Sequence, residues 1–467
     1  MNALNRRTFL VASSVGFAGM QFGISAGASN EADIPPRAKP AKSTILFFLC
    51  GGASHIDTWD MKPDAPAEYR GVFHPIETSA PGVRLCEHLP MLAKQAHHLT
   101  VINSVSGSVN TNDHHAGYYY NLTGHVPDQS FRTLGNNRTP FPDDWPHLGT
   151  VVGAKRPQHP YLANAITLPH KPSRAPYTRP GQFAARLGVE HEPLYVYGSV
   201  EKPLEFRAPS LKLQTGVDPP RLASRNELLA ALNTARREFD SVAEVARLSR
   251  QQQRAVSLLA SSSTAKAFDV QNEDQKTRER YGETVNGMGL LMARRLVQAG
   301  VPFVTVFWLE SPKIKTKCKS AGGWDTHGNN FNCLKDCLLP EFDRGFSALI
   351  EDLADRDMLD ETLLYVTSEM GRKPKIGDPR SGGVKGAGRD HWTHALSHLL
   401  IGGGIRGGQT YGATDRLGEY PHDLRVTPAH TAKTIYYAMG IRDLEARDQQ
   451  NRPYNLLADG WPLTELF

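Results

Sequence analysis

The stretch "STILFFLCGG", residues 43–52, decides the fold class of this chain. An apolar run that ends in a glycine pair is typical of a strand buried on both faces of a parallel sheet and followed by a tight turn. Further strands are predicted for "LTVINSVSG" at 99–107, "VPFVTVFWL" at 301–309, "ETLLYVTSEMG" at 361–371 and "HALSHLLIGGG" at 394–404.

Helical patterns lie between and around these runs. The segments "HHAGYYYNLTG" at 114–124, "NELLAALNTARREFDSVAEVA" at 226–246, "TVNGMGLLMARRLVQAG" at 284–300 and 334–359 are expected to be helices. Alternation of strands and helices predicts an α/β protein, namely a three-layer α/β/α sandwich around a mostly parallel central sheet.

The domain organisation follows from composition along the chain. Residues 29–42 are expected to form a linker, and residues 43–467 a single α/β domain. Within that domain, about 125–220 is rich in Pro, Gly, Arg and aromatic residues and is interpreted as a loop-rich insertion, while about 225–300 is interpreted as a helical segment.

The first 28 residues are interpreted as a targeting segment that is not part of the fold. Arg6 and Arg7 precede Phe9 and Leu10, which matches the twin-arginine export pattern, and the apolar run behind them is too short and weak for a membrane span. Ala26-x-Ala28 offers a cleavage site for removing the segment. The sequence therefore predicts export to the periplasm or cell envelope, with no transmembrane helix after removal of the signal.

Charge and cysteine content exclude some classes of function. The 53 basic and 48 acidic residues are interspersed, so no basic stripe indicates nucleic-acid binding. Five cysteines imply no disulfide framework, and no haem or iron–sulfur spacing supports an electron-transfer protein. Cys333 and Cys337 lie one helical turn apart, which suits either a metal or an ordinary helix face.

Histidine and carboxylate residues follow several of the predicted strands, at the edge where parallel sheets bind ligands. The candidate metal ligands are His55 and Asp57 after the first strand, Asp325 and His327 in "GGWDTHGNN", Glu369 after the strand that starts at 361, and Asp390, His391 and His394 in "GRDHWTH". Asp390 either joins the site or caps a turn while His391 or His394 binds. Delivery of such residues from separate segments predicts one metal cluster holding Zn²⁺, Mn²⁺ or Ca²⁺.

Three further residues are candidates for catalysis. His114 and His115 begin a predicted helix, whose N-terminus suits an anion, although a capped helix end facing solvent explains them equally well. Arg372, or Lys373 beside it, is a candidate clamp for an anionic group. A metal cluster with these residues would polarise an ester oxygen and activate a water or hydroxyl.

Long motifs in this chain resemble a bacterial family called domain of unknown function 1501. The resemblance rests on "LFFLCGGASHIDTWDMKPDAP", "HHAGYYYNLTG", "VPFVTVFW", "GGWDTHGNNF", "SEMGRKP" and "GRDHWTHALSHLLIGGGIRGGQTYGATD", and it extends from about Lys42 to the C-terminus. The family is similar to the alkaline phosphatase and sulfatase superfamily. The resemblance implies an alkaline-phosphatase-like fold, a metal-dependent hydrolase site, and an anionic ester substrate such as a sulfated or phosphorylated polysaccharide.

The resemblance also assigns roles and leaves two hypotheses. Asp57 resembles the superfamily's first-strand aspartate ligand, Asp325 with His327 its spaced Asp and His pair, and His391 or His394 its late histidine. The chain has no Cys-x-Pro-x-Arg or Cys-x-Ala-x-Arg sulfatase motif, and Met370 stands where a histidine often follows the acid. The chain is thus expected to be an exported phosphate or sulfate ester hydrolase, or else a noncatalytic, metal-stabilised envelope or carbohydrate-binding protein.

Overall fold

The computed structural model describes residues 34–107, 112–160, 162–174, 177–208, 266–318, 323–377, 388–448 and 451–467. The chain divides into two compact units, Met1–Arg37 and Ala38–Phe467, and all elements below belong to the second. The predicted signal peptide, the start of the predicted linker and the helix expected at 226–246 lie outside the described residues.

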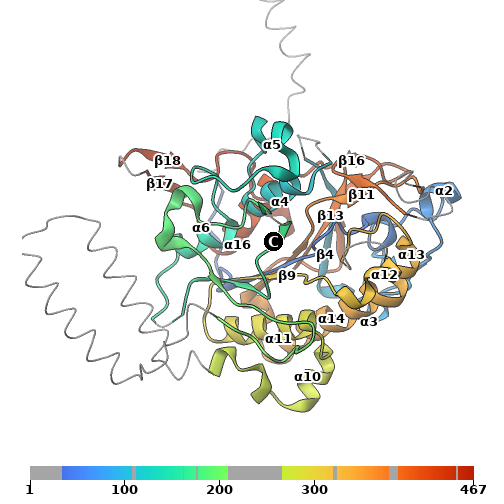
Figure 1. Cartoon of the computed structure of the whole chain (residues 1–467), viewed down its shortest axis with the longest axis horizontal. Helices are drawn as coiled ribbons and strands as arrows, with labels where there is room; N and C mark the ends of the chain where they lie inside the picture. The colour runs from blue at the N-terminus through green and yellow to red at the C-terminus, as the bar shows by residue number, and fades with distance from the viewer. Residues whose placement is uncertain are drawn as a thin grey trace, which may run out of the picture. The chain divides into compact units, whose positions relative to one another are not determined.

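An eight-stranded sheet with the order β14-β4-β13-β10-β1-β9-β5-β8 forms the centre of the second unit (Figure 1). The strands in this order are Gln409–Tyr411, Leu99–Val105, Leu396–Gly402, Thr362–Thr367, Ser43–Phe48, Phe303–Phe307, Ala165–Leu168 and Leu194–Tyr195. Strand β13 runs antiparallel to β4 and β10, and all other neighbours in this sheet are parallel. The mostly parallel central sheet expected from the sequence is confirmed.

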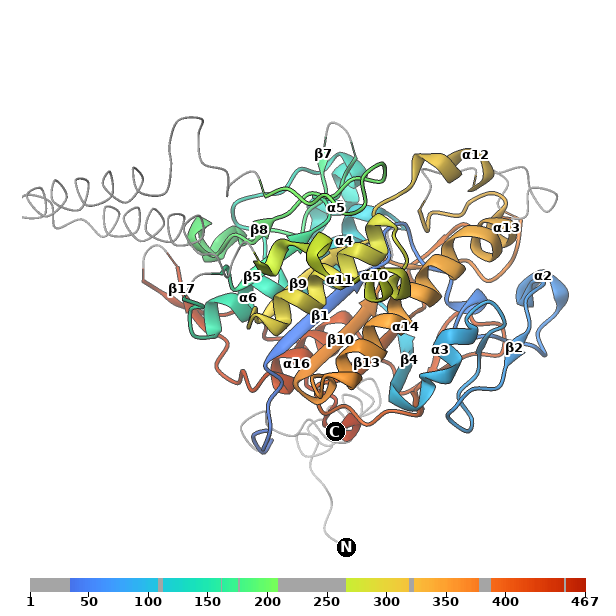
Figure 2. The same ribbon diagram turned by 90° about the horizontal axis from the view of Figure 1, so that it is seen from below.

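Helices cover both faces of the sheet (Figures 1 and 2). One layer contains α3 (Pro90–Lys94), α10 (Gln275–Tyr281), α11 (Val285–Gln298) and α14 (Leu339–Asp355). The other contains α4 (His114–Thr123), α6 (Leu148–Lys155) and α16 (Pro428–Ala438). This arrangement confirms the predicted three-layer α/β/α sandwich.

Strand β1 shows why the sheet lies between two layers. All six of its residues are buried, and consecutive side chains of a strand point to opposite faces. The ring of Phe47 stacks on that of Phe342 in α14 at 5.8 Å between centroids. The ring of Phe48 packs against Tyr118 in α4 at 4.7 Å. One apolar run therefore supplies the core of both layers.

Local capping sets where α4 begins and ends. The side chain of Asp113 accepts a hydrogen bond from the His115 amide at 2.9 Å, and Gly124 ends the helix with a left-handed φ of 78°. The cap leaves His114 and His115 in the first turn, where their side chains diverge. The helix predicted at 114–124 is confirmed.

The helix predicted from 334 begins earlier than expected. Residues Asn330–Cys333 form α13, a π-helical turn covers Leu334–Leu338, and α14 follows directly. Pro340 lies at the start of α14 and has no amide hydrogen to donate to the preceding turn, which explains the wider turn before it. The spacing of apolar residues predicted a helix here, but it does not distinguish a π-helical turn from an α-helical one.

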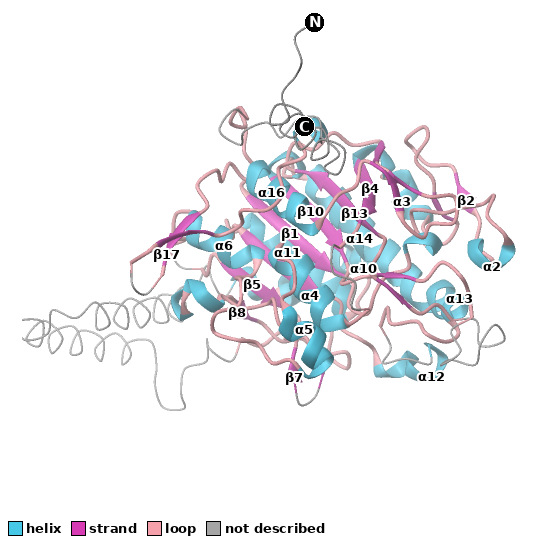
Figure 3. Ribbon diagram, turned by 90° about the horizontal axis from the view of Figure 1, so that it is seen from above, coloured by secondary structure: helices cyan, strands magenta, loops and turns pink. Residues whose placement is uncertain are grey.

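The described part of the segment 125–220 holds helices as well as short strands, as Figure 3 shows. Besides β5, β8 and α6, its described part holds α5 (Gln129–Leu134) and the β6–β7 ribbon, Ser173–Arg174 with Tyr177–Thr178. The edge strand β8 and its neighbour β5 come from this segment. None of the described helices has the length and apolar character needed to cross a bilayer.

Short elements complete the described structure. They are η2 His55–Asp57, α2 Ala67–Arg70, β2 Pro75–Ile76, β3 Leu85–Cys86, η3 Ala96–His98, η4 Gly135–Asn137, η5 Ala185–Leu187, η6 Val189–His191, η8 Val270–Asn272, η9 Pro312–Ile314, α12 Lys315–Cys318, η11 Leu359–Glu361, β11 Gly371–Arg372, β12 His391–Trp392, β15 Ala413–Thr414, β16 Pro421–Asp423, β17 Glu445–Arg447, β18 Pro453–Asn455 and η13 Thr464–Leu466.

Candidate metal centre

Three parallel neighbours in the sheet, β10, β1 and β9, end at the same edge. The turn Cys50–Gly52 follows β1, Glu369 follows β10, and the segment with Asp325 and His327 comes after β9. The glycine pair lets this segment approach closely, because a Cβ on Gly51 would lie 2.3 Å from the backbone nitrogen of Asp325. The ends of the strands thus bring distant residues together.

Three ligand atoms converge at this edge. The Nε2 atoms of His327 and His391 are 2.9 Å apart, and the Asp325 Oδ1 atom lies 3.0 Å from the first and 3.2 Å from the second. A tetrahedral ion with ligand bonds of roughly 2.0 Å needs its ligand atoms about 3.3 Å apart. These three atoms therefore have nearly the spacing of one face of a tetrahedral site.

The other ring nitrogens of the two histidines face oxygen atoms. His391 Nδ1 lies 2.9 Å from the carbonyl oxygen of Asn112, and His327 Nδ1 lies 3.7 Å from Asp390 Oδ1. When Nδ1–H of His391 donates to the Asn112 carbonyl oxygen, this imidazole keeps its lone pair on Nε2, which is the metal-binding tautomer. The residues present thus fit a divalent cation held by Asp325, His327 and His391. Asp390 Oδ1 accepts a hydrogen bond from the His391 amide at 2.7 Å, so Asp390 orients the backbone at His391.

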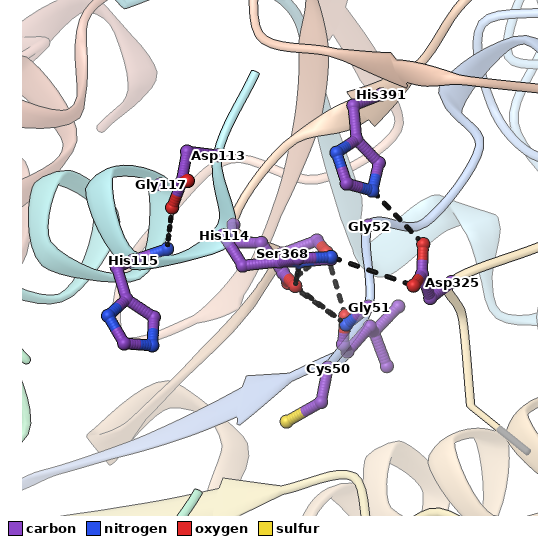
Figure 4. Close-up of polar contacts among 12 residues, drawn as sticks. Cys50, Gly51, Gly52, Asp113, His114, His115, Gly117, Asp325, Ser368 and His391 are labelled. Atoms are coloured by element: carbon purple, nitrogen blue, oxygen red, sulfur yellow. Dashed lines mark hydrogen bonds and ion pairs between the residues drawn. The ribbon is translucent and has the colours of Figure 1, made fainter. Parts of the chain in front are cut away.

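His114 and Glu369 form a second, deeper pair beside these ligands. His114 Nδ1 lies 2.8 Å from Glu369 Oε1, and its Nε2 lies 3.6 Å from Asp325 Oδ2. The amide of Gly51 donates to both oxygens of Glu369, at 2.9 and 3.1 Å. In Figure 4, His114 and His391 both point toward Asp325. The Gly51 amide thus fixes Glu369, and Glu369 fixes His114, at the buried side of the centre.

The electrostatics of the cluster favour an ionised Asp325, a protonated His114 and a neutral His391. Burial by itself would raise the pKa of Asp325, but Arg372 and the histidines His114, His327 and His391 hold that pKa well below its usual range. Burial would lower the pKa of His114, yet hydrogen bonds with Asp325 and Glu369 raise it. Burial also lowers the pKa of His391, which favours the neutral imidazole that a metal requires.

Arg372 does not have the substrate-clamping role expected from the sequence. It is fully buried and donates to the carbonyl oxygens of Gly51, Gly52 and Arg389 and to Asp325. Its donors face protein acceptors on several sides, so it positions Asp325 and the glycine turn. This is a correction to the predicted anion clamp.

Four other predicted residues lie outside the ligand cluster. Asp57 is held by Arg389 in a buried ion pair of 2.7 Å, so its oxygens already have a charged partner. His55 Nε2 contacts the Gly418 carbonyl oxygen at 2.8 Å. His115 contacts the carbonyl oxygen of Arg138 at 3.0 Å and points away from the cluster (Figure 4). His394 packs against Trp392 and Tyr420, with centroid distances of 4.6 and 5.0 Å.

Two charged residues beside the centre, Glu310 and Arg179, were not predicted from the sequence. Glu310 follows β9, and burial raises its pKa, while Arg179 opposes that rise and Asp325 and Glu369 add to it. Its place just after a predicted strand was a usable signal. Arg179 belongs to the loop after β7, where no periodic pattern marks it. Its guanidinium lies 4.8 Å from the ring centroid of Tyr118 in α4.

A disulfide closes the segment that carries Asp325 and His327. Cys318 and Cys333 are bonded, with a sequence separation of 15 residues. This single bond was not predicted, and it excludes the alternative in which Cys333 and Cys337 bind a metal together. The sequence could not show it, because an odd set of five cysteines does not identify a pair.

Replacing Cys318 and Cys333 together with serine is expected to lower the free energy of unfolding by about 3 kcal/mol, the entropic value for a closed loop of about 15 residues. Urea unfolding measures the change. Cys337→Ser is the matched control, since Cys337 is a free, partly buried thiol, and its effect is expected to stay within about 0.5 kcal/mol. An unfolding midpoint that reduction leaves unchanged would contradict the prediction.

Comparisons with known proteins agree with the resemblance noted in the sequence. The profile of a family described as "Protein of unknown function (DUF1501)" matches residues 41–467. The chain belongs to the DUF1501 family. No curated protein matches this DUF1501 chain.

Several solved structures are similar to this DUF1501 chain. The PsFucS1 sulfatase from Pseudoalteromonas sp. has 12% identity and a TM-score of 0.38, with 94% of this chain and 72% of that chain covered. The phosphonate monoester hydrolase SpPMH from Silicibacter pomeroyi has 12% identity and a TM-score of 0.39, with 90% and 76% covered. A mutant of the alkaline phosphatase PafA has 9% identity and a TM-score of 0.41, with 93% and 99% covered. Similarity this low transfers no activity or substrate to the DUF1501 chain.

Proposed function

We propose that this DUF1501 protein is a metal-dependent hydrolase of phosphate or sulfate esters, with a divalent cation held by Asp325, His327 and His391. The observation that carries the proposal is the convergence of their three ligand atoms within 2.9–3.2 Å. Two imidazoles and one carboxylate suit Zn²⁺ or Mn²⁺ better than Ca²⁺, which prefers oxygen ligands.

The charge beside the centre supports an anionic substrate. Arg179 Nη1 is buried and has no hydrogen-bond partner among the described residues. Its positive charge acts on Glu369 and Glu310, which line the same end of the sheet. A buried, unpaired donor costs about 1–3 kcal/mol, and an oxygen of a phosphate or sulfate group would remove that cost.

The chain's own residues divide the remaining work. A bound cation would polarise the ester and lower the pKa of an attacking water. Arg372 holds Asp325 in place, and the Asn112 carbonyl oxygen orients the His391 ring. His114, fixed by Glu369, is the group placed to give a proton to the leaving oxygen, because its Nε2 faces the centre. Arg179 would hold the anionic group.

Metal analysis combined with turnover tests the proposal. The purified protein is expected to contain about one equivalent of Zn²⁺ or Mn²⁺ and to hydrolyse members of a panel of phosphate and sulfate monoesters, including sulfated and phosphorylated oligosaccharides. Chelation should abolish hydrolysis, and the same ion should restore it. Metal-loaded protein without turnover on the whole panel would refute the hydrolase proposal.

Arg179→Ala is expected to raise KM for an anionic ester about 10-fold or more, because a charge-assisted hydrogen bond contributes about 1.5–3 kcal/mol. Steady-state kinetics on the metal-loaded enzyme measure the change. Arg179→Lys keeps the charge and is expected to recover part of the loss, while metal content stays constant in both variants. An unchanged KM would exclude Arg179 from substrate binding.

One observation favours the noncatalytic alternative. The residue after Glu369 is Met370, which is fully buried and packs near Gly52. This position therefore supplies a thioether and not an imidazole. A thioether is a poor ligand for Zn²⁺ or Mn²⁺, which limits a second metal site. A metal-stabilised envelope or carbohydrate-binding protein would bind metal tightly and gain stability from it, yet show no turnover in the same assay.

We also propose that the protein is exported by the twin-arginine route to the periplasm or cell envelope. The Arg6-Arg7 pattern motivates this, and the Cys318–Cys333 disulfide supports it, because such bonds persist in oxidising compartments. Replacing both arginines with lysine should leave the full-length protein in the cytoplasm on cell fractionation. Unchanged export would count against this route.

A further inference from the structure

Asp57 is a fully buried carboxylate at the end of η2, the short helix after strand β1, and both of its oxygens accept hydrogen bonds. Its Oδ1 accepts from Arg389 Nη2 at 2.9 Å. Its Oδ2 accepts from Arg389 Nε at 2.7 Å, from Asn330 Nδ2 at 2.9 Å and from Ser54 Oγ at 2.7 Å. One carboxylate therefore joins three segments that are far apart in the sequence.

The hydrogen bonds from Arg389 to Asp57, the first arm of this network, lead to the His391 side of the metal centre. Arg389 directly precedes Asp390 and His391, and it is itself fully buried. Besides the two bonds to Asp57, it donates to the carbonyl oxygens of Tyr69 and Pro374. A planar guanidinium held at both ends has little freedom, so the backbone entering the His391 strand is fixed.

The second arm reaches the other side of the centre. Asn330 lies three residues after His327, and its Oδ1 accepts from Thr326 Oγ1 at 2.5 Å. Thr326 stands between the two ligands Asp325 and His327, so Asp57 is connected to their segment through two hydrogen bonds. The side chains of Thr326 and Asn330 are both fully buried.

The two ligand segments also touch directly. A Cβ added to Gly388, the residue before Arg389, would lie 1.2 Å from the carbonyl oxygen of His327. The two segments are therefore in close contact. Two charged side chains are bonded to both of them: Asp57 through Arg389 and Asn330, and Arg372 through the Arg389 carbonyl oxygen and Asp325. Neither arm involves an atom that the proposed cation would contact.

We propose that Asp57 is a positioning residue that sets the distance between the Asp325–His327 segment and His391, and hence the affinity for the cation. This inference rests on the proposed metal centre. Asp57→Asn keeps the shape of the side chain but removes its negative charge. One carboxylate oxygen becomes an NH₂ group, which then faces the N–H donors of Arg389 or Asn330. The two segments are then free to move apart.

Cation affinity measured by chelator competition tests the proposal with Zn²⁺ and Co²⁺. Asp57→Asn is expected to weaken Zn²⁺ binding about 10- to 100-fold, as changes behind metal ligands typically do. The visible absorption of the Co²⁺ form should change as well, because it reports coordination geometry. The matched control is Asp352→Asn. Asp352 is a buried carboxylate paired with Arg294 at 2.8 Å and Arg356 at 2.6 Å in the α11–α14 layer.

The outcomes separate positioning from a merely structural role. Both variants are expected to lower the urea midpoint, but only Asp57→Asn should lose cation affinity. Equal affinity for the two variants would overturn the proposal. If Asp57→Asn does not fold, Asn330→Ala provides the test, because it removes the hydrogen bond between Asn330 and Asp57 but keeps the Asp57–Arg389 ion pair. Cation binding that is several-fold weaker in Asn330→Ala supports the proposal. Unchanged cation affinity overturns it. Wild-type protein that binds no cation would refute the metal centre itself, which is a different result.

Discussion

Asp325→Asn is expected to weaken Zn²⁺ binding by more than about 100-fold, a larger loss than changes behind the ligands produce. Asp325 Oδ1 lies within 3.0–3.2 Å of both histidine Nε2 atoms, so this residue contributes the only carboxylate of the proposed ligand triad. The amide has the same shape but lacks the negative charge, and one of its two terminal atoms is a donor. Isothermal titration or chelator competition measures the affinity.

The control for this prediction uses a histidine that the sequence also nominated. His394 packs against Trp392 and Tyr420. Among the described residues, two groups have ligand atoms within 4.8 Å of one another, namely His114 with Asp325 and His391, and His327 with Asp390 and His391, and neither includes His394. His394→Asn is therefore expected to keep the wild-type affinity within about twofold. If His394→Asn loses the cation and Asp325→Asn keeps it, the proposed ligand triad is wrong.

Gly51→Ala is expected to have the largest effect on stability, lowering the free energy of unfolding by about 3 kcal/mol or more and impairing cation binding. Gly51 has a φ of +122°, and its added Cβ would lie 2.3 Å from Asp325 N and 2.7 Å from the Trp324 carbonyl carbon. Both neighbours are backbone atoms, so the strand end and the ligand segment must separate to make room. Urea unfolding and Zn²⁺ competition measure the two effects.

Gly82→Ala isolates the part of this cost that comes from backbone conformation. Gly82 has a φ of +85°, but no atom lies within 4 Å of an added Cβ. Its replacement is expected to cost only about 1–2 kcal/mol, which is the penalty for a left-handed L-residue, and to leave cation affinity unchanged. Equal losses for Gly51→Ala and Gly82→Ala would show that the close approach to Asp325 does not matter.

The strands were predictable because their signal is local. In β1, β4, β9, β10 and β13, apolar runs mark the residues that both helical layers bury, and glycines mark where three of them turn. The wider helical turn at Leu334–Leu338 and the helices within 125–208 were not predicted in detail, since packing and a single proline shape them.

The candidate site was only partly predictable for a different reason. Residue type and position after a strand nominate Asp325, His327 and His391, but they nominate Asp57, His55 and His394 equally well. The difference lies in the partner of each side chain. Arg389 pairs with both oxygens of Asp57, whereas Asp325 pairs with Arg372 and also faces the Nε2 atoms of His327 and His391. Asp57 and Arg389 are 332 residues apart, so the residues around Asp57 in the sequence do not indicate this pairing.

The amino-acid sequence alone determined the three-layer α/β architecture, the family and the edge of the sheet where polar residues gather, because apolar runs, glycine turns and long motifs are contiguous in the chain. Only the tertiary structure decided which of those residues face one another. Arg372 and Arg389 have similar neighbours in sequence, yet one supports a ligand and the other holds Asp57, since three-dimensional packing selects the acceptors that a buried guanidinium meets.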